Sequence, residues 1–310
     1  MALSLFLAPV SSIYAQSTLA TSDGLEISPA LVEVSAVKGK SYKVDLKVRN
    51  VTKADLVFDS TVNDFGAKDE TGAANIILDT NSDLPTSIKS WVSSIPTFNL
   101  SPGEVKSFKV DISVPTSAEP GGHYGVIRFA GRTLGAGANI GQVASAGTLI
   151  LIRVDGKINE LVDLASFDAT KNGGNTSALF ESGPLTFVTR FKNSGSVHEK
   201  PVGQIEVRDG FGNSIAVIPV NKDAGNVLPG SIRRFESPLD TGWMFGHYTA
   251  DLSVGYGTTG QAIVRTISFW VIPYKIVLLS LVGLTTILYI LRGTMKRYNK
   301  HIITQSRKKR

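Results

Sequence analysis

The stretch Ser41–Asn50, SYKVDLKVRN, alternates apolar and polar side chains along its whole length. Its apolar residues are Tyr42, Val44, Leu46 and Val48. Successive side chains of a β-strand point to opposite faces of a sheet, so a period of two predicts a strand with one buried face and one solvent-facing side. Residues 106–115, KSFKVDISVP, repeat the pattern. Such strands are typical of an antiparallel sandwich.

A second block of strand patterns follows Gly156, and the alternation is clearest in Tyr248–Tyr256. The two blocks carry the same landmarks in the same order: a strand that ends in Asn, a Pro-Gly turn, and a Gly-His-Tyr triplet. They are VRN (48–50), LSPGE (100–104) and GGHYG (121–125), then FKN (191–193), LPGS (228–231) and FGHY (245–248). Shared turn chemistry and common ancestry would both produce this order. We expect an all-β fold with two tandem immunoglobulin-like β-sandwiches, over residues 24–155 and 156–270.

Residues 271–291, VIPYKIVLLSLVGLTTILYIL, contain a single charge, Lys275. About 20 apolar residues at a rise of 1.5 Å each span roughly 30 Å, the thickness of the hydrocarbon core of a bilayer. A buried core helix is the alternative, but such helices are usually shorter and amphipathic. Trp270, Tyr274 and Tyr289 lie where an aromatic belt would meet the membrane surface. The sequence therefore predicts one transmembrane α-helix after the second sandwich.

The tail, residues 292–310, carries eight Lys or Arg residues and no acid. Because positive charge beside a span marks the cytoplasmic side, we expect a single-pass cell-membrane protein with an extracellular N-terminus and a cytoplasmic C-terminus. Residues 1–15 fit a signal peptide, since the apolar run Leu3–Val10 is followed by small residues up to Ala15. Because no Lys or Arg precedes that run, we expect a truncated or misplaced start codon, with an ordinary apolar N-terminus as the alternative.

The net charge of +6 belongs to the tail and not to the exported part. Of the 32 Lys and Arg residues, eight lie in the tail, which leaves 24 against 26 acids, or a net charge of −2. The basic balance therefore indicates no nucleic-acid partner; the tail is expected to fix topology and to attract anionic lipid. The chain has no cysteine, which excludes disulfides, thiolate metal sites and Cys nucleophiles.

Two stretches depart from the strand pattern. Residues 84–92 predict a short helix, with Pro85 suited to its first turn and Trp91 on its inner side. Residues 130–147, AGRTLGAGANIGQVASAG, are rich in Gly and Ala and join two strong strands. We expect this second stretch to be a long, exposed and mobile loop that does not pack.

A search for metal-binding chemistry gives one weak candidate. Asp79, Asn81 and Asp83 have the alternating oxygen ligands of a calcium loop, but Leu84 stands where an EF-hand needs Gly and Ser90 where it needs Glu. We favour a polar turn over a calcium site. The four histidines show no metal-ligand spacing. The sequence predicts no metal site and no cofactor.

The residues His123, Tyr124, His247 and Tyr248 form the two Gly-His-Tyr triplets, and we interpret them as structural and not functional. A ligand-specific residue has no reason to appear in both blocks, whereas a turn-fixing residue does. Tyr248 shares a strand face with Leu252, so it is expected to be buried. No nucleophile–base pair or Gly-x-Ser-x-Gly motif occurs, so we expect no catalytic residue and a protein that is not an enzyme.

Several motifs of the first block resemble WxL-interacting surface proteins of bacteria. They are ISP (27–29), VRN (48–50), Trp91, LSPGE (100–104), VPTSAEPGGHYG (114–125) and TLILIRV (148–154). The resemblance implies an exported protein with two immunoglobulin-like domains and a C-terminal span with a basic tail. It further implies peptidoglycan binding by the first domain and binding of other surface ligands, including host proteins, by the second. The second block, with FKNSGSVHEKPVGQIEVRDGFGN (191–213), looks more like a general extracellular sandwich of bacterial or archaeal surface proteins.

Three functions remain open on the sequence alone. The leading hypothesis is a membrane-anchored extracellular binding or scaffolding protein that docks cell-wall polymer or a partner surface protein. The alternative is a membrane-tethered assembly chaperone that acts by strand addition, which an unpaired apolar strand edge in domain one would favour. An enzyme with an unrecognised site is disfavoured, because no nucleophile–base or metal constellation appears.

Overall fold

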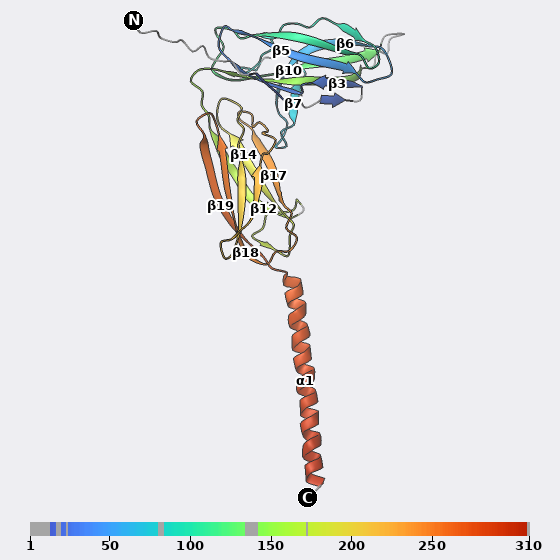
Figure 1. Cartoon of the computed structure of the whole chain (residues 1–310), viewed down its shortest axis with the longest axis vertical. Helices are drawn as coiled ribbons and strands as arrows, with labels where there is room; N and C mark the ends of the chain where they lie inside the picture. The colour runs from blue at the N-terminus through green and yellow to red at the C-terminus, as the bar shows by residue number, and fades with distance from the viewer. Residues whose placement is uncertain are drawn as a thin grey trace, which may run out of the picture.

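The computed structural model describes residues 13–16, 20–22, 24–79, 84–133, 142–171 and 173–308. Within them, two β-sandwiches are followed by one long helix, which confirms the expected all-β class with a C-terminal apolar helix. Strands β1 to β11 form domain one, and strands β12 to β19 form domain two. Figure 1 shows domain two between domain one and the helix.

Domain one is built from a seven-stranded and a four-stranded sheet. The larger sheet has the order β1 (Ile13–Gln16), β4 (Leu31–Ala36), β11 (Gln142–Val154), β10 (Gly121–Thr133), β6 (Leu56–Ala67) and β7 (Ala74–Ile77), with β8 (Phe98–Leu100) also paired to β6. The smaller sheet has the order β2 (Ala20–Ser22), β3 (Leu25–Ser28), β5 (Ser41–Asn50) and β9 (Val105–Ser113). The facing sides bury one core, which includes Leu46, Phe58, Ile112 and Phe129.

Domain two is built from a three-stranded and a five-stranded sheet. The first has the order β12 (Val162–Thr170), β14 (Leu185–Asn193) and β17 (Ile232–Leu239). The second has the order β13 (Leu179–Phe180), β19 (Gln261–Val271), β18 (Gly246–Tyr256), β15 (Val202–Asp209) and β16 (Ser214–Val220). Their core includes Phe187, Phe191, Leu252 and Phe269.

The two domains repeat one topology. The order β4-β11-β10-β6-β7 in domain one matches β13-β19-β18-β15-β16 in domain two, and each order starts with a parallel pair. The order β3-β5-β9 matches β12-β14-β17 in the same way. The repeated landmarks in the sequence therefore reflect a repeated arrangement of strands.

The strand-ending Asn and the Pro-Gly turn form one structural unit that is used twice. Asn50 is buried, and its carbonyl oxygen accepts the N–H of Gly103 at 2.8 Å. Asn193 is buried in domain two, and its carbonyl oxygen accepts the N–H of Gly230 at 2.9 Å. Each Asn side chain also donates to two backbone carbonyl oxygens. The buried amide thus ties the end of one strand to the turn that opens another.

The helix expected over residues 84–92 is wrong. This segment consists of turns, in which Ser87 bridges to Tyr124 of β10 and Val92 bridges to Ile112 of β9. Backbone groups that bond to neighbouring strands are not available for a helix, so tertiary pairing overrides the local preference. Trp91 is nevertheless buried in the core, as expected.

The loop expected over residues 130–147 is also largely wrong. Strands β10 and β11 continue through Thr133 and from Gln142, and Arg132 still pairs with Gln142. A Cβ atom added at Gly131 would lie 2.8 Å from Cε1 of Phe58, so this glycine allows close packing and does not mark a flexible loop. Residues 134–141 lie outside the described residues.

Helix α1 spans Tyr274–Lys308, and its segment Tyr274–Tyr298 has a mean hydropathy of 2.0. By length and composition this segment can cross a membrane. The helix begins three residues later than the predicted span, because Val271 is still the last, buried residue of β19 and Pro273 follows it. At the other end, residues 1–12 of the predicted signal peptide lie outside the described residues, and Ile13–Gln16 pairs with β4.

Candidate binding cleft between the domains

Charged side chains join the two domains at two points. Glu33 of β4 contacts two residues of domain two. Its Oε2 lies 2.5 Å from Lys200 Nζ, and its Oε1 accepts a hydrogen bond from Asn226 Nδ2 at 2.6 Å. Glu70, in the turn between β6 and β7, bonds Arg190 Nε at 2.7 Å. The carbonyl oxygen of Glu70 also accepts the backbone N–H of Arg234 at 2.7 Å. The β6–β7 hairpin thus reaches from domain one onto β17 of domain two (Figure 1).

The outer face of the seven-stranded sheet is apolar where domain two covers it. Phe65, Tyr124, Val126 and Leu151 are buried there, outside the main core of domain one. A sheet with one wet face alternates apolar and polar residues, whereas a sheet covered on both faces does not. This cover explains why the stretch 148–154, TLILIRV, is almost continuously apolar.

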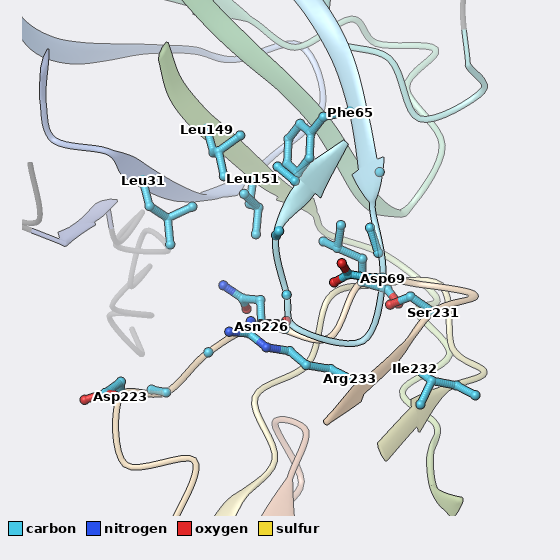
Figure 2. A pocket seen from close by; sticks show the side chains of 18 residues that line it. Leu31, Phe65, Asp69, Leu149, Leu151, Asp223, Asn226, Ser231, Ile232 and Arg233 are labelled. Atoms are coloured by element: carbon cyan, nitrogen blue, oxygen red, sulfur yellow. Dashed lines mark hydrogen bonds between the residues drawn. The ribbon is translucent and has the colours of Figure 1, made fainter. Parts of the chain in front are cut away.

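A cleft of about 260 Å³ remains beside this apolar contact. Domain one lines it with leucines and an aromatic ring, and domain two lines it with the loop between β16 and β17 and the first residues of β17. Figure 2 shows Leu31, Leu149 and Leu151 on one side of the cleft, with Asn226 and Arg233 on the opposite side. The main lining residues are Leu31, Phe65, Leu149, Leu151, Asn226, Leu228 and Arg233.

Arg233 is the principal charged group of the cleft. Its Nη1 donates to the carbonyl oxygen of Asn226 at 2.7 Å, and its guanidinium lies 5.2 Å from the ring centroid of Phe235. Its Nε is buried without a hydrogen-bond partner, and no ion pair of Arg233 occurs among the described residues. Burial lowers its pKa. Asp69 and Asp223 also line the cleft, but neither is bonded to this guanidinium.

Two glycines make room for that guanidinium. A Cβ atom on Gly72 would lie 2.3 Å from Cζ of Arg233, and one on Gly225 would lie 2.7 Å from its Nη2. Gly72 also has a φ of 85°, which other residues rarely adopt. Asn226 presents a second unsatisfied atom, since its Oδ1 is buried without a partner. The cleft therefore offers a cationic donor and an amide acceptor beside apolar walls.

A second cavity, of about 380 Å³, lies between the domains and holds several titratable groups. Arg153 of β11 bonds Glu160 of the linker, and its Nη1 lies 3.9 Å from Oε1 of Glu199. Burial first, and then the neighbouring Glu160, raise the pKa of Glu199 to about 7. Burial lowers the pKa of His198 to about 4, so this imidazole is neutral at neutral pH. Among the described residues that line this cavity, Arg153 and Lys200 are each paired with an acid, so neither is as available to an anionic ligand as Arg233 is.

The two Gly-His-Tyr triplets are not equivalent, which corrects the expectation from sequence. Gly121 pairs with Val154 and Gly246 pairs with Val271, so these glycines occupy matching places and each triplet is shifted by one residue against the other. A shift of one residue places a side chain on the opposite face of a sheet.

The shift separates the two tyrosines. Tyr248 packs in the core of domain two and is 8% exposed, as expected. Tyr124 points out of its sandwich, and its hydroxyl lies 3.3 Å from Nδ1 of His198 in domain two. His123 faces Trp91 with 4.5 Å between ring centroids, whereas His247 faces the half-exposed Trp270 at 5.0 Å. That these four residues are structural stays a prediction.

The predicted metal candidate can be followed only in part. Asp79 is described, but Asn81 and Asp83 lie outside the described residues. Within the described part of the chain, no group of three or more His, Asp or Glu side chains is arranged to hold a metal ion. The sequence did not single out Arg233 or Glu199. An Arg in an alternating strand is ordinarily solvent-facing, and only the cover from the β6–β7 hairpin makes Arg233 part of a cleft.

No family model and no curated protein matches this sequence. Weak structural likenesses exist. The class 5 fimbriae chaperone CfaA shares 12% identity and a TM-score of 0.38, over 78% of this chain and 98% of its own. The Escherichia coli chaperone DraB shares 13% sequence identity and a TM-score of 0.34, over 79% of this chain and 96% of its own. A Porphyromonas gingivalis protein of unknown function shares 13% sequence identity and a TM-score of 0.30, over 80% of this chain and 100% of its own. Likenesses this weak carry no argument about function, and the resemblance to WxL-interacting proteins stays a prediction.

Proposed function

We propose that this chain is a membrane-anchored extracellular binding protein, and not an enzyme, whose inter-domain cleft holds an anionic group on an apolar carrier. The observation that carries the proposal is Arg233, a half-buried cation without an acidic partner among the described residues. A buried charge without a partner is costly, so a ligand that brings a carboxylate recovers free energy on binding.

The walls of the cleft favour a protein partner over a wall polymer. Leu31, Leu149 and Leu151 offer apolar contact, which suits an aliphatic side chain next to a carboxylate. A glycan presents hydroxyl groups that would leave such walls poorly matched. The helix α1 would hold the cleft at the cell surface, where a partner surface protein can present this chemistry. A cell-wall polymer is the outcome that the test below must exclude.

Binding of a simple probe tests the cleft. We expect the full chain in detergent micelles to bind N-acetyl-leucine more tightly than its uncharged amide, measured by isothermal titration calorimetry. Arg233→Gln should remove this difference, and Arg233→Lys should retain part of it, since a lysine keeps the charge but loses the forked donor. Arg49→Gln, on the outer face of β5, is the matched control and should bind as the wild type does.

Equal binding of acid and amide by the wild type would overturn the proposal. Retained preference for the acid in Arg233→Gln would place the anion site elsewhere. Binding of the chain to isolated cell wall and to a preparation of surface proteins then shows which of the two supplies the anionic ligand. Capture of purified wall by the wild type and not by Arg233→Gln would replace the protein partner with a polymer.

A second candidate, strand addition, is favoured by one observation in domain two. In domain one, β4 covers β11 over six paired residues, Leu149 to Val154. In domain two the matching strand β13 covers only Trp270 and Val271 of β19. The N–H of Trp270 points to this side, so by alternation the N–H groups of Val264, Thr266 and Ser268 face an edge that no described strand covers.

The uncovered edge has an apolar inner row. Ile263 and Ile267 pack only partly against the core, whereas Ile150, which matches Ile267 by register, is fully buried under β4. A partner strand that lies parallel to β19, as β4 lies parallel to β11, would complete this row. The edge expected for strand addition in domain one is therefore not the one that we propose.

Two substitutions at one exposed position test strand addition. Val264→Pro removes a single outward N–H, while Val264→Ala keeps the N–H and removes the same side chain. The probe is a short peptide of alternating threonine and valine, and its binding to the full chain is measured by fluorescence anisotropy. We expect the Pro variant alone to weaken binding. Equal affinities of the two variants would contradict strand addition at this edge.

A further inference from the structure

The strongly exposed aromatic side chains of the two sandwiches gather at one end of domain two. Phe211 is 94% exposed, Trp243 85%, Phe245 63% and Trp270 49%. Among residues 24–133 and 145–155 of domain one, no aromatic side chain is exposed to this degree. A single exposed apolar residue needs no explanation, but several large aromatic rings exposed together at one end of a domain do.

Strand pairing places these four rings on neighbouring elements. Trp270 lies on β19 and pairs with His247 of β18, directly after the loop that carries Trp243 and Phe245. Asp209, which begins the turn of Phe211, pairs with Tyr248, the next residue along β18. The aromatic rim, defined here as Phe211, Trp243, Phe245 and Trp270, therefore follows three adjacent strands at one end of the sheet.

This end of the sheet is the end from which the helix leaves. Only Ile272 and Pro273 separate β19 from Tyr274, the first residue of α1. Lys275 Nζ lies 2.6 Å from Oε2 of Glu181, so the first turn of the helix is bonded to domain two. Figure 1 shows the loops at this end of domain two beside the start of α1.

The rim is held in place and is not a floppy loop. Met244 is buried between the exposed Trp243 and Phe245, and it anchors the segment in the core. Phe245 N–H donates to the hydroxyl of Tyr248 at 3.0 Å, and that hydroxyl lies 3.2 Å from the carbonyl oxygen of Phe245. The buried Tyr248 thus fixes the backbone that presents two of the rings to solvent.

We infer that the aromatic rim rests in the interfacial layer of the membrane that α1 crosses, so that domain two contacts the lipid surface directly. Trp and Phe side chains are stabilised at the boundary between headgroups and hydrocarbon, and Trp is enriched there. The polar layer adds about 5–8 Å to each side of the hydrocarbon core, which brings the end of a tethered domain within its reach. The lipid surface is chosen over a protein partner because the rim is continuous with the span.

The inference rests on the membrane anchor of the proposed function but not on its cleft. The contact would fix the tilt of domain two and hold domain one away from the lipid. It requires no specific lipid, since the described rim consists of rings and not of cations. Vesicles of phosphatidylcholine are therefore a sufficient partner.

Quenching by brominated lipid tests the contact. The full chain is reconstituted in phosphatidylcholine vesicles with bromine near the headgroup end of the acyl chains, in three forms that each keep one of the three tryptophans. Emission of Trp243 should be blue-shifted and quenched in brominated vesicles relative to ordinary ones. Trp91, which is buried in domain one, is the internal control and should not be quenched.

The outcomes separate the rim from the anchor. If the chain does not float with the vesicles in a density gradient, the anchor itself is wrong, and the inference falls with it. If it floats and Trp243 is quenched no more than Trp91, the rim does not touch lipid and the inference alone is overturned. Two further variants test whether several rings hold the domain at the membrane. Quenching of Trp243 should persist in Phe211→Ser and should be lost in the double variant Phe211→Ser, Phe245→Ser.

Discussion

At the scale of residues, the chain separates groups that complete the fold from groups that are left over. The side-chain amides of Asn50 and Asn193 donate to backbone carbonyl oxygens, and the hydroxyl of Tyr248 bonds to the backbone of Phe245. Among the described residues, nine buried side-chain atoms have no hydrogen-bond partner, and Arg233 Nε and Asn226 Oδ1 are two of them. These two differ from the rest because both residues line the inter-domain cleft, where a ligand could reach them.

Tyr248→Ala should lower the unfolding midpoint of domain two severely. The ring is buried in the core, and truncation of a buried aromatic costs about 3–5 kcal/mol. Chemical denaturation of the full chain in detergent, followed by circular dichroism, measures the loss. Tyr248→Phe is the control; it removes only the hydroxyl bonds and should cost about 1 kcal/mol. An unchanged midpoint with lost ligand binding in Tyr248→Ala would assign this residue to a site instead.

Glu199 should make the fold less stable as pH rises. Its pKa is about 7 in the folded chain, against 4.5 for an ordinary Glu, so between these values the folded state keeps a proton that the unfolded state has lost. The free energy of unfolding therefore falls as pH rises through this window, by up to about 3 kcal/mol, and levels off above the folded pKa.

Denaturation midpoints at about pH 5 and about pH 8 measure this effect. Glu199→Gln has no titrating group there, so its midpoint should change less between the two conditions, and it should gain most over the wild type at the higher pH. Glu236→Gln, an exposed carboxylate paired with Arg234, is the control and should keep the slope of the wild type. An equal slope in Glu199→Gln would show that another group titrates.

At the scale of elements, the apolar–polar alternation of the sequence predicts the strands that have one wet face. Segments without this alternation become strands only through their packing against neighbours. The alternation in Ser41–Asn50 and Tyr248–Tyr256 predicts β5 and β18 with the correct buried faces. The Gly and Ala content of residues 130–147 does not reveal a strand, because the close approach of Gly131 to the Phe58 side chain exists only after β10 has paired with β6.

The candidate site was less predictable than the strands for a related reason. Arg233 occupies a strand position that reads as solvent-facing, and its burial depends on the β6–β7 hairpin from another domain. The inversion between the two Gly-His-Tyr triplets likewise depends on a shift of one residue in pairing, which the motif does not encode.

Replacement of residues 130–147 by a short Gly-Ser turn should destabilise domain one. The change would remove paired residues of β10 and β11, among them Phe129's neighbour Ala130 and the partly buried Ala146, which packs against the core. Thermal unfolding measures the loss. Replacement of residues 134–141 alone keeps both paired arms and is the control, for which we expect a small change. Equal melting temperatures for the two variants would show that the paired arms add nothing to stability.

At the scale of the whole molecule, two joints determine how the parts act together. Glu33 and Glu70 bond domain one to domain two, and the ion pair between Lys275 and Glu181 bonds domain two to the helix. The cleft lies between the domains, the open edge runs along β19, and the aromatic rim lies at the end of domain two from which α1 leaves. A ligand in the cleft would contact both domains, so it would also stabilise the angle between them.

The orientation in the membrane follows from charge and completes this arrangement. Arg292, Lys296 and Arg297 follow the uncharged run 276–291 at its far end, whereas its near end is preceded by Lys275, which is paired with Glu181. Because unpaired positive charge is retained in the cytoplasm, both sandwiches should lie outside and the tail inside.

Protease added to intact cells should therefore leave only a small fragment that carries the tail, detected with an antibody against residues 292–310. A variant with the Lys and Arg residues of the tail replaced by Gln loses the charge bias and should give a mixture of cleaved and protected chains, while substitution of the same number of exposed Lys residues in domain one should change nothing. Full-length protein that stays protected in intact cells, and is cleaved only after the membrane is opened, would place the sandwiches inside and would remove the basis for a surface partner.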